Sequence, residues 1–544
     1  MSILVVLGLA GLILQTGEQA TEIQAQCLGC HASPSMVYVD PARGGHSVSV
    51  AEATVAAPWN AHADLACTEC HTDVHSEATA EGHGVSEETG SEHTPLETAV
   101  MERKGAWSLA AIKACGDCHD EAFEAWTQSA HAEGLIDQTT AEGSDNPGPT
   151  CVECHGAHEI RMVADPGSPV TTHNIPALCM GCHASQRIVG TFQTSVHGQK
   201  YSLTGKDREV GVAVCSTCHS YHEVRAAGDP ESQLHLSRRA EVCGQCHRGA
   251  NEKFALSFSH DDPEENPVVH AVHIIHVLLT GLIAGSMLVF MGSEAFRIVR
   301  CFIWRRPLLP PTTASPDRLY RRWTWAVRIQ HVILVTAFTL LSVSGIPLMF
   351  PGARTAQFTI RLLGGVDEAA LIHRVGAVLL IIVAIIHAIW VFIWILRGKR
   401  WSPILFNFQD AKDSVAMLKY SWGISKERPR MGRYAPPEKF EYLAAAGGTV
   451  VMTLTGLLMW FPELSARFVG GAGVQLAQIM HGHEGVLAVV VILIIHVCWV
   501  HFMPGFWPMS MVWLTGRIRR DAMEEYHAAE LEEIEAGKKG AGNR

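Results

Sequence analysis

The sequence predicts a mostly α-helical protein in two parts, a loop-rich N-terminal domain followed by a bundle of five membrane-spanning helices. Two observations support this division of the 544-residue chain. The region 1–265 is polar and carries all but two of the cysteines. The stretch from about 267 to 514 is dominated by long apolar runs. A chain of this length is expected to form more than one domain, and here the two parts face different solvents.

Seven motifs of the form Cys-x-x-Cys-His run through the first part. Two thiols at this spacing add across the two vinyl groups of one haem, and the adjacent histidine ligates its iron. A single copy could be half of a zinc site, but seven copies, each with its histidine, predict seven c haems rather than zinc sites or disulfides. The motifs are Cys27-Cys30-His31, Cys67-Cys70-His71, Cys115-Cys118-His119, Cys151-Cys154-His155, Cys179-Cys182-His183, Cys215-Cys218-His219 and Cys243-Cys246-His247.

The motifs belong to an internal repeat, because the same interval separates Cys115 from Cys179, Cys179 from Cys243, and Cys151 from Cys215. Further histidines recur after the motifs. An iron held between two imidazoles has no open coordination position and is suited to electron transfer. The expected distal ligands, whose pairing with individual haems the sequence does not show, are His46, His75, His131, His158, His197, His222 and His260. Five others receive no role: His62, His83, His93, His173 and His235.

Few long periodic segments occur in this part, so haems should supply much of its core, with short helices carrying each motif. Residues 21–262 resemble the multihaem c-type cytochromes, in which repeated motifs form a chain of haems. We therefore expect a heptahaem c domain at 21–265. It is preceded at 1–20 by a signal peptide or N-terminal anchor, whose apolar run from 3 to 14 is too short to span a bilayer.

Five segments of the second part are long and apolar enough to span a membrane. The loops at 297–328 and 397–439 and the start of the C-terminal tail are rich in basic residues, which the positive-inside rule places in the cytoplasm. The haem domain then lies on the extracytoplasmic side of a bacterial inner membrane, the side on which c haems are attached. The predicted spans are 268–296, 326–350, 371–396, 440–461 and 484–514.

Histidines are rare inside membranes unless they bind something. The interval from His373 to His387 corresponds to about 21 Å of helix rise on nearly one face. A ladder of this kind suits two haems stacked across a four-helix bundle. The histidines of these segments and their ends are His331, His373, His387, His481, His483, His496 and His501.

From Trp325 onward the chain resembles the dihaem cytochrome b subunit of membrane-bound formate dehydrogenases and nickel–iron hydrogenases. The resemblance rests on Arg328-Ile-Gln-His331, Ser344-Gly345, Pro351, His373-Arg374, Lys439-Phe-Glu-Tyr442, Thr455-Gly456, Trp460, His481-Gly-His483 and Ile495-His496. It implies a four-helix domain at 326–516 and a cytoplasmic tail at 517–544, expected to be a solvated helix. It also implies two b haems and electron exchange with a quinone.

By this resemblance the outer b haem lies between His373 and either His481 or His483, and the inner one lies between His331 and His496. The chain departs from the family in three ways. Val332 replaces the tryptophan that follows the first ligand. The interval in the last helix, from His481 or His483 to His496, differs by one residue from the family's usual spacing. His387 is a rival ligand for the inner haem.

The region 266–325 adds a helix that the four-helix family core lacks. Its His270, His273 and His276 could ligate the last c haem, support a third b haem or line the junction between the two parts.

Together these features predict a quinone-linked oxidoreductase component that passes electrons between the quinone pool and an extracytoplasmic cytochrome or other redox protein. The formal net charge of −12 argues against a nucleic-acid partner. Two alternatives stay open. One is a c-haem reductase of small oxyanions, which would need a five-coordinate haem. The other is an anchor that docks the subunits of a larger dehydrogenase complex.

Overall fold

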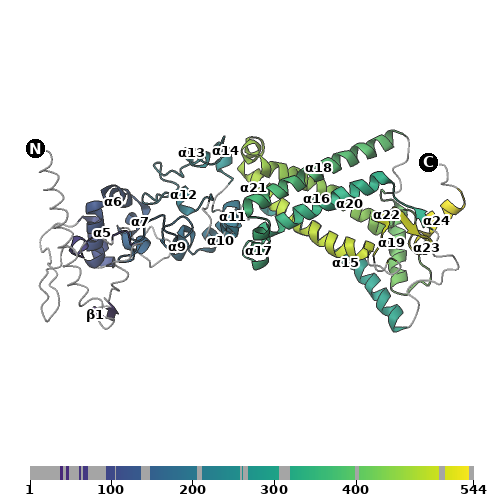
Figure 1. Ribbon diagram of the computed structural model, residues 1–544, viewed down its shortest axis with the longest axis horizontal. Coiled ribbons are helices and arrows are strands. Elements are labelled where there is room, and N and C mark those ends of the chain that lie inside the picture. The colour runs from purple at the N-terminus through teal and green to yellow at the C-terminus, as the bar shows by residue number, and fades with distance from the viewer. Residues whose placement is uncertain are drawn as a thin grey trace, which may run out of the picture. The chain divides into compact units, whose positions relative to one another are not determined.

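The computed structural model describes residues 37–40, 44–47, 60–62, 65, 67–71, 94–104, 106–136, 148–204, 211–257, 260, 267–304, 319–397, 404–501, 506 and 509–537 (Figure 1). The chain divides into two compact units, Met1–Ala255 and Leu256–Arg544. Three predicted features lie outside the described residues: the N-terminal segment 1–20, the motif Cys27-Cys30-His31 and His75.

The first unit consists of short helices joined by loops, and the longest described helix has 13 residues. The helices are α3 Cys67–Cys70, α4 Pro95–Lys104, α5 Ala106–Cys118, α6 Asp120–Thr127, α7 Ala130–Ile136, α8 Cys151–His155, α9 Ile175–Cys182, α10 Gln186–Thr194, α11 Val196–Leu203, α12 Cys215–His219, α13 Arg239–Gly244 and α14 Glu252–Ala255. One hairpin precedes them, in which β1 Val37–Asp40 pairs antiparallel with β2 Gly44–Ser47. Four helices share a small apolar core of Val100, Leu109, Ile112, Trp126, Ala132 and Leu135.

The internal repeat is visible in the loops that follow α8 and α12. Arg161 pairs with Asp165 at 3.4 Å, and Arg225 pairs with Asp229 at 3.2 Å. Each aspartate also accepts a backbone N–H from two residues further on, Gly167 in one loop and Glu231 in the other. The same side-chain contacts therefore fix the same turn in both copies.

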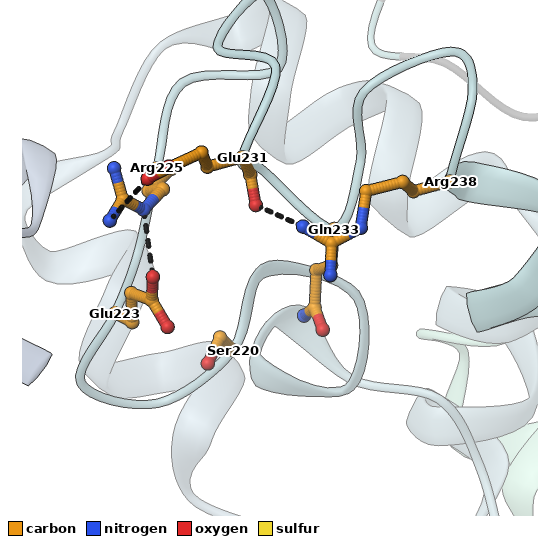
Figure 2. Close-up of a pocket in the computed structure, with 6 residues that line it drawn as sticks. All are labelled: Ser220, Glu223, Arg225, Glu231, Gln233 and Arg238. Carbon is orange, nitrogen blue, oxygen red and sulfur yellow. Dashed lines mark hydrogen bonds and ion pairs between the residues drawn. The ribbon is translucent and has the colours of Figure 1, made fainter.

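The second copy of this loop encloses a small polar pocket (Figure 2). Arg225 also pairs there with Glu223 at 2.9 Å and with Glu231 at 3.1 Å. Arg238 donates to the backbone oxygen of Glu231 at 2.5 Å. Because these contacts hold the loop together, we interpret the pocket as part of the repeat scaffold.

The second unit is built around long helices, several of which lie side by side (Figure 1). Its elements are α15 Pro267–Ile303, β3 Leu319–Arg321, α16 Trp325–Met349, α17 Arg354–Leu362, α18 Val366–Leu396, α19 Phe408–Ser421, α20 Pro436–Trp460, α21 Pro462–Val490, the π-helix η2 Val491–His501, α22 Val512–Thr515, β4 Arg517–Arg519, α23 Arg520–Tyr526 and α24 Ala528–Glu535.

Four helices of the described residues are long and apolar enough to cross a membrane: Trp325–Met349, Val366–Leu396, Pro436–Trp460 and Pro462–Leu493. The first three agree closely with the predicted spans. The predicted segment 268–296 is helical as part of α15, but its role as a fifth span stays a prediction.

The last long helix begins at Pro462, well before its predicted start at 484, and continues to His501. Pro462 fits the first turn of a helix, because its missing N–H would have no helical partner there. Gly470 then adopts non-helical backbone angles, with a positive φ of 72°, so two helices meet there at a kink. The stretch 462–483, which lies between the last two predicted spans, is therefore not a loop but two helices that meet at a kink.

The C-terminal tail packs back on the protein, whereas the sequence suggested a solvated helix. β4 pairs antiparallel with β3, and a core forms from Tyr320, Ile518, Ala522, Met523 and Leu531. Glu530, only 2% exposed, accepts from Arg322 at 2.6 Å and from Arg433 at 2.9 Å. Two arginines around one buried carboxylate tie the tail to the loops before α16 and α20, which explains why so charged a segment is buried.

His527 makes the packing of this tail sensitive to pH. Burial, and then nearby Arg322, lowers the pKa of His527 to about 3, against about 6.5 in an unfolded chain. The unfolded tail therefore binds the proton first, so stability is full above the unfolded pKa and is lost as the pH falls below it. Linkage predicts a loss of about 2 kcal/mol at about pH 5.

Hydrogen exchange of residues 517–537, measured between about pH 7.5 and about pH 5 and corrected for intrinsic rates, should show this loss. In His527→Gln, which keeps a donor for the Gly432 carbonyl oxygen, the loss should disappear. Equal pH dependence in both proteins would contradict the role of His527.

Candidate metal centres

Each described Cys-x-x-Cys-His motif presents two free thiols on one side of a helical turn. Residues three apart in a helix are neighbours, so the two sulfurs project together. All the described motif cysteines are free thiols. In α8 the start of the helix is fixed by a reciprocal cap, in which Thr150 N–H donates to the carboxylate of Glu153 at 2.8 Å. The motif therefore contains a residue that positions its own helix.

Five motif histidines face a second imidazole across a gap of nearly constant width. A metal ion bonded to one nitrogen of each ring at about 2 Å places the two ring centroids about 6 Å apart. The observed gaps therefore fit one metal ion each. The centroid distances are 6.1 Å for His71–His158, 6.0 Å for His119–His62, 6.1 Å for His155–His222, 6.2 Å for His183–His131 and 6.2 Å for His247–His197.

These pairs offer a metal two ligands and no more. Within the described ranges, no three His, Cys, Asp or Glu side chains form a group that could hold a metal ion. A zinc site, which takes three or four ligands from the protein, therefore does not fit these pairs. A haem does fit, because its porphyrin supplies four nitrogens and leaves two axial positions for the facing rings.

The facing histidines come from neighbouring repeats rather than from the motif's own repeat. His158 follows the motif that ends at His155 but faces His71, and His131 follows the motif of His119 but faces His183. The next copy of the repeat obeys the same rule, with His222 facing His155 and His197 facing His247. The structure thus shows which imidazoles face each other across neighbouring repeats.

His62 is the residue that sequence reasoning missed, since it faces His119 although it had been given no role. An aromatic residue shortly before the histidine could have revealed it: Trp59 stands three residues before His62, as Trp126 and Phe192 stand five before His131 and His197. Three expected distal ligands lie outside the five pairs. His46 is in β2 with its side chain outside the described part, His75 is not described, and His260 is described but joins none of the five.

Burial lowers the pKa of four of the facing rings in the first unit, those of His131, His155, His197 and His222. Burial, and then facing His183, lowers the pKa of His131. Burial, and to a smaller extent the facing ring of His247, lowers the pKa of His197. Neutral imidazole is the form that ligates a metal, so these environments favour ligation at neutral pH.

Successive motifs also lie next to one another. The thiol of Cys115 hydrogen-bonds with that of Cys151, and in the next copy of the repeat Cys179 does so with Cys215. Burial raises the pKa of Cys218 to about 11, and neighbouring Cys243 and Cys246 add to the rise. Cys154 is close enough to Cys179 and Cys182, and Cys70 to Cys115 and Cys118, for the neighbouring thiols to add to the rise in pKa that burial causes. The motifs from the second to the seventh therefore form one series in space.

In the helical bundle His373 on α18 faces His481 on α21 with ring centroids 6.2 Å apart. Ser344 Oγ donates to the Leu340 carbonyl oxygen at 2.6 Å, so it accepts from His373 Nδ1–H at 2.9 Å. Thr455 repeats this arrangement, donating to Val451 at 2.7 Å and accepting from His481 Nδ1–H at 3.0 Å. Both rings are thereby held with Nε2 available to a metal.

A glycine follows each of these hydroxyl residues and makes room for the ring. A Cβ at Gly345 would lie 2.9 Å from His373 Cε1, and one at Gly456 would lie 3.2 Å from His481 Cε1. The Ser-Gly and Thr-Gly pairs are therefore matched to the histidines opposite them. His483 follows His481 by two residues, a rotation of about 200° around the helix, so the geometry favours His481 of the two candidates.

A second pair, His331 on α16 and His496 on η2, has ring centroids 6.4 Å apart. His496 Nδ1 lies 2.6 Å from the Glu441 carboxylate, although the two groups do not meet hydrogen-bond geometry. Trp323 and Trp513 flank the His331 ring at 5.1 and 6.2 Å. Aromatic contacts and a carboxylate thus orient this pair, where hydroxyls orient the other.

The remaining histidines of the bundle are placed differently. Both ring nitrogens of His387 are hydrogen-bonded, to Gln330 at 3.0 Å and to Tyr442 at 2.8 Å, and this ring is in neither of the two facing pairs. His501 stands edge-on to His496 at 6.2 Å, with its Nδ1 directed at the Ser510 carbonyl oxygen at 3.3 Å.

The bundle itself is similar to known cytochromes. Residues 322–510, which include all four candidate spans and both histidine pairs, match the family described as prokaryotic cytochrome b561. Among the relatives are the cytochrome b556(fdo) subunits of formate dehydrogenase from Escherichia coli strains K12 and O157:H7. Each is 24% identical over 173 residues, which is 32% of this chain and 75% of the relative. The chain therefore carries a membrane-embedded domain of the prokaryotic cytochrome b561 type.

Proposed function

We propose that the chain passes electrons between the quinone pool and an extracytoplasmic redox partner, through two b haems and seven c haems. The observation that carries the proposal is the set of seven facing histidine pairs, five in the first unit and two in the bundle. All seven gaps have the width that one iron between two imidazoles requires.

His373 with His481, and His331 with His496, would hold the two b haems. A haem supplies one-electron chemistry at its iron. The chain's own residues orient it: Ser344 and Thr455 hold one pair of rings in the tautomer that ligates through Nε2, and Glu441 faces Nδ1 of His496. A hydrogen bond or carboxylate contact at Nδ1 also makes the opposite nitrogen a stronger donor to iron.

The cysteine pairs of the first unit would hold the c haems, with the facing histidines as distal ligands. Two imidazoles complete the coordination of an iron, so a haem of this kind relays electrons and does not bind substrate. For the five described pairs, this argues against the alternative of an oxyanion reductase. The close sequence of motifs supports transfer from one haem to the next.

The orientation in the membrane is proposed from charge. Basic residues concentrated in the loops 297–328 and 397–439 would face the cytoplasm, which leaves the first unit on the extracytoplasmic side. Electrons would then pass between the quinone pool in the bilayer and an extracytoplasmic cytochrome or other redox protein.

A second candidate is an electron-transferring anchor for a separate catalytic subunit. It is favoured by the relatives, which are named as subunits of formate dehydrogenase. Co-purification of a dehydrogenase subunit from the native membrane would support this role.

The cofactor content is the first test of the proposal. A pyridine haemochrome assay on purified protein should give c and b haem in a ratio near seven to two. The double variant Cys151→Ala, Cys154→Ala should lose one c haem and keep both b haems. Protein without b haem would remove the quinone mechanism, and protein without c haem would remove the path beyond the bundle.

His62 should be the distal ligand of the haem attached at Cys115 and Cys118. Substituting His62→Ala leaves that iron with one axial imidazole, so one haem should change from low spin to high spin in the electron paramagnetic resonance spectrum. His235→Ala is the matched control, because His235 Nδ1 is bonded to Ser237 Oγ at 2.8 Å and faces none of the motifs in the five pairs. An unchanged spectrum for His62→Ala would contradict the assignment.

Ser344 should tune one b haem. Ser344→Ala removes the acceptor for His373 Nδ1–H, which weakens the imidazole as a donor and favours ferrous over ferric iron. A redox titration should therefore show a higher midpoint potential for one b haem only. Thr339→Val, on the same helix, removes a hydroxyl that is bonded only to its own helix and should leave both potentials unchanged. Equal potentials in Ser344→Ala and wild type would refute the role.

A further inference from the structure

Three polar side chains from three helices meet inside the apolar bundle, and none of them belongs to a histidine pair. They are Gln330 on α16, His387 on α18 and Tyr442 on α20. The carbonyl oxygen of Gln330 can only accept, so His387 Nδ1–H donates to it at 3.0 Å. His387 Nε2 is then an acceptor, and the Tyr442 hydroxyl donates to it at 2.8 Å.

This triad borders the His331–His496 pair. Gln330 precedes His331 in the chain, and Tyr442 follows Glu441, whose carboxylate lies 2.6 Å from His496 Nδ1. Consecutive Cα atoms are about 3.8 Å apart, so Gln330 lies next to one histidine of the pair and Tyr442 lies next to the carboxylate beside the other. His387 lies almost four helical turns beyond His373, which puts it about 21 Å along α18 from the other pair.

His387 itself is half-buried, but the stretch of α18 that carries it also has an exposed apolar face, which includes Trp390 at 41% exposed. Ile386 and Ile389, next to it on α18, are 45% and 53% exposed. The ring of Trp390 lies 6.0 Å from that of His387 and stacks in turn on Trp394. A polar pair beside a flat aromatic surface, reachable from the hydrocarbon, fits a small aromatic head group carried on a lipid tail.

We propose that His387 and Tyr442 bind the head group of the quinone beside the His331–His496 centre. The pair offers one donor and one acceptor. A quinone carbonyl can accept from the Tyr442 hydroxyl, and a hydroquinone hydroxyl can donate to His387 Nε2. The Tyr442 hydroxyl and His387 Nε2 therefore suit both redox states. When the head group binds, the hydrogen bond between Tyr442 and His387 is replaced by a hydrogen bond from one of them to the head group. Gln330 is a positioning residue, which fixes the His387 tautomer.

Polar side chains within a bilayer are costly and usually serve a binding or transfer role. Both ring nitrogens of His387 form hydrogen bonds, so the proposal does not use this ring as an iron ligand. This inference rests on the proposed function, because it names the residues of the quinone site that the electron path requires.

The test is a binding titration on the purified holoprotein. Heptyl-hydroxyquinoline N-oxide, a fluorescent quinol analogue, is titrated, and its quenching gives a dissociation constant. Tyr442→Phe, which loses one hydrogen bond and little volume, should weaken binding about tenfold. His387→Leu should weaken it at least as much. Thr449→Val on α20 is the matched control, since its exposed hydroxyl bonds only to Ala445 of its own helix, and it should bind like wild type.

Haem content and low-spin spectra should be unchanged in both variants, because neither side chain contacts a ligand ring of the two pairs. Wild-type affinity in Tyr442→Phe with normal b haem would overturn the inference while leaving the electron path intact. Weaker binding accompanied by loss of b haem in both variants would show a structural role and would also overturn it. If wild-type protein neither binds the analogue nor accepts electrons from quinol, the proposed function itself fails.

Discussion

The gap between facing imidazoles is the constraint on which the rest of the structure depends. It stays between 6.0 and 6.4 Å in seven pairs, although the two units are built very differently. In the first unit, short helices and a small apolar core could not fix such distances alone. Each pair there joins segments that are far apart in the chain, as His71 and His158 do. An iron in each gap would tie neighbouring repeats together, which explains how so loop-rich a domain can be ordered.

The bundle fixes its rings by a different route. Long helices supply the distance, and groups around each ring supply the orientation. Ser344 and Thr455 occupy matching positions opposite His373 and His481, each followed by a glycine that admits the ring. At the His331–His496 pair, tryptophans and Glu441 orient the rings. The hydrogen-bonded side chains of His387 and Tyr442 come from the same region of the bundle. We interpret this asymmetry as functional: one centre only relays electrons, whereas the other adjoins the place where they enter or leave.

Sequence reasoning could find the motifs, the repeat and the helices that carry ligands, because these depend on local spacing. It missed His62, because the imidazole that His62 faces is set by the packing of neighbouring repeats and the one local signal, the preceding Trp59, stands at a different spacing from the one before His131. Choosing His481 over His483 needed the contact between the rings of His481 and His373, which spacing along the chain does not show. The buried tail was missed because both partners of Glu530, Arg322 and Arg433, are remote from it in the chain.

The most direct test of this account is an experimental density map of the purified protein at a resolution that shows single iron atoms. The account predicts one iron midway between the two rings of each of the seven pairs, with His62 on the iron opposite His119, and successive irons close enough for electron transfer. Imidazoles that face each other with no iron between them, or a bundle without haem, would contradict it.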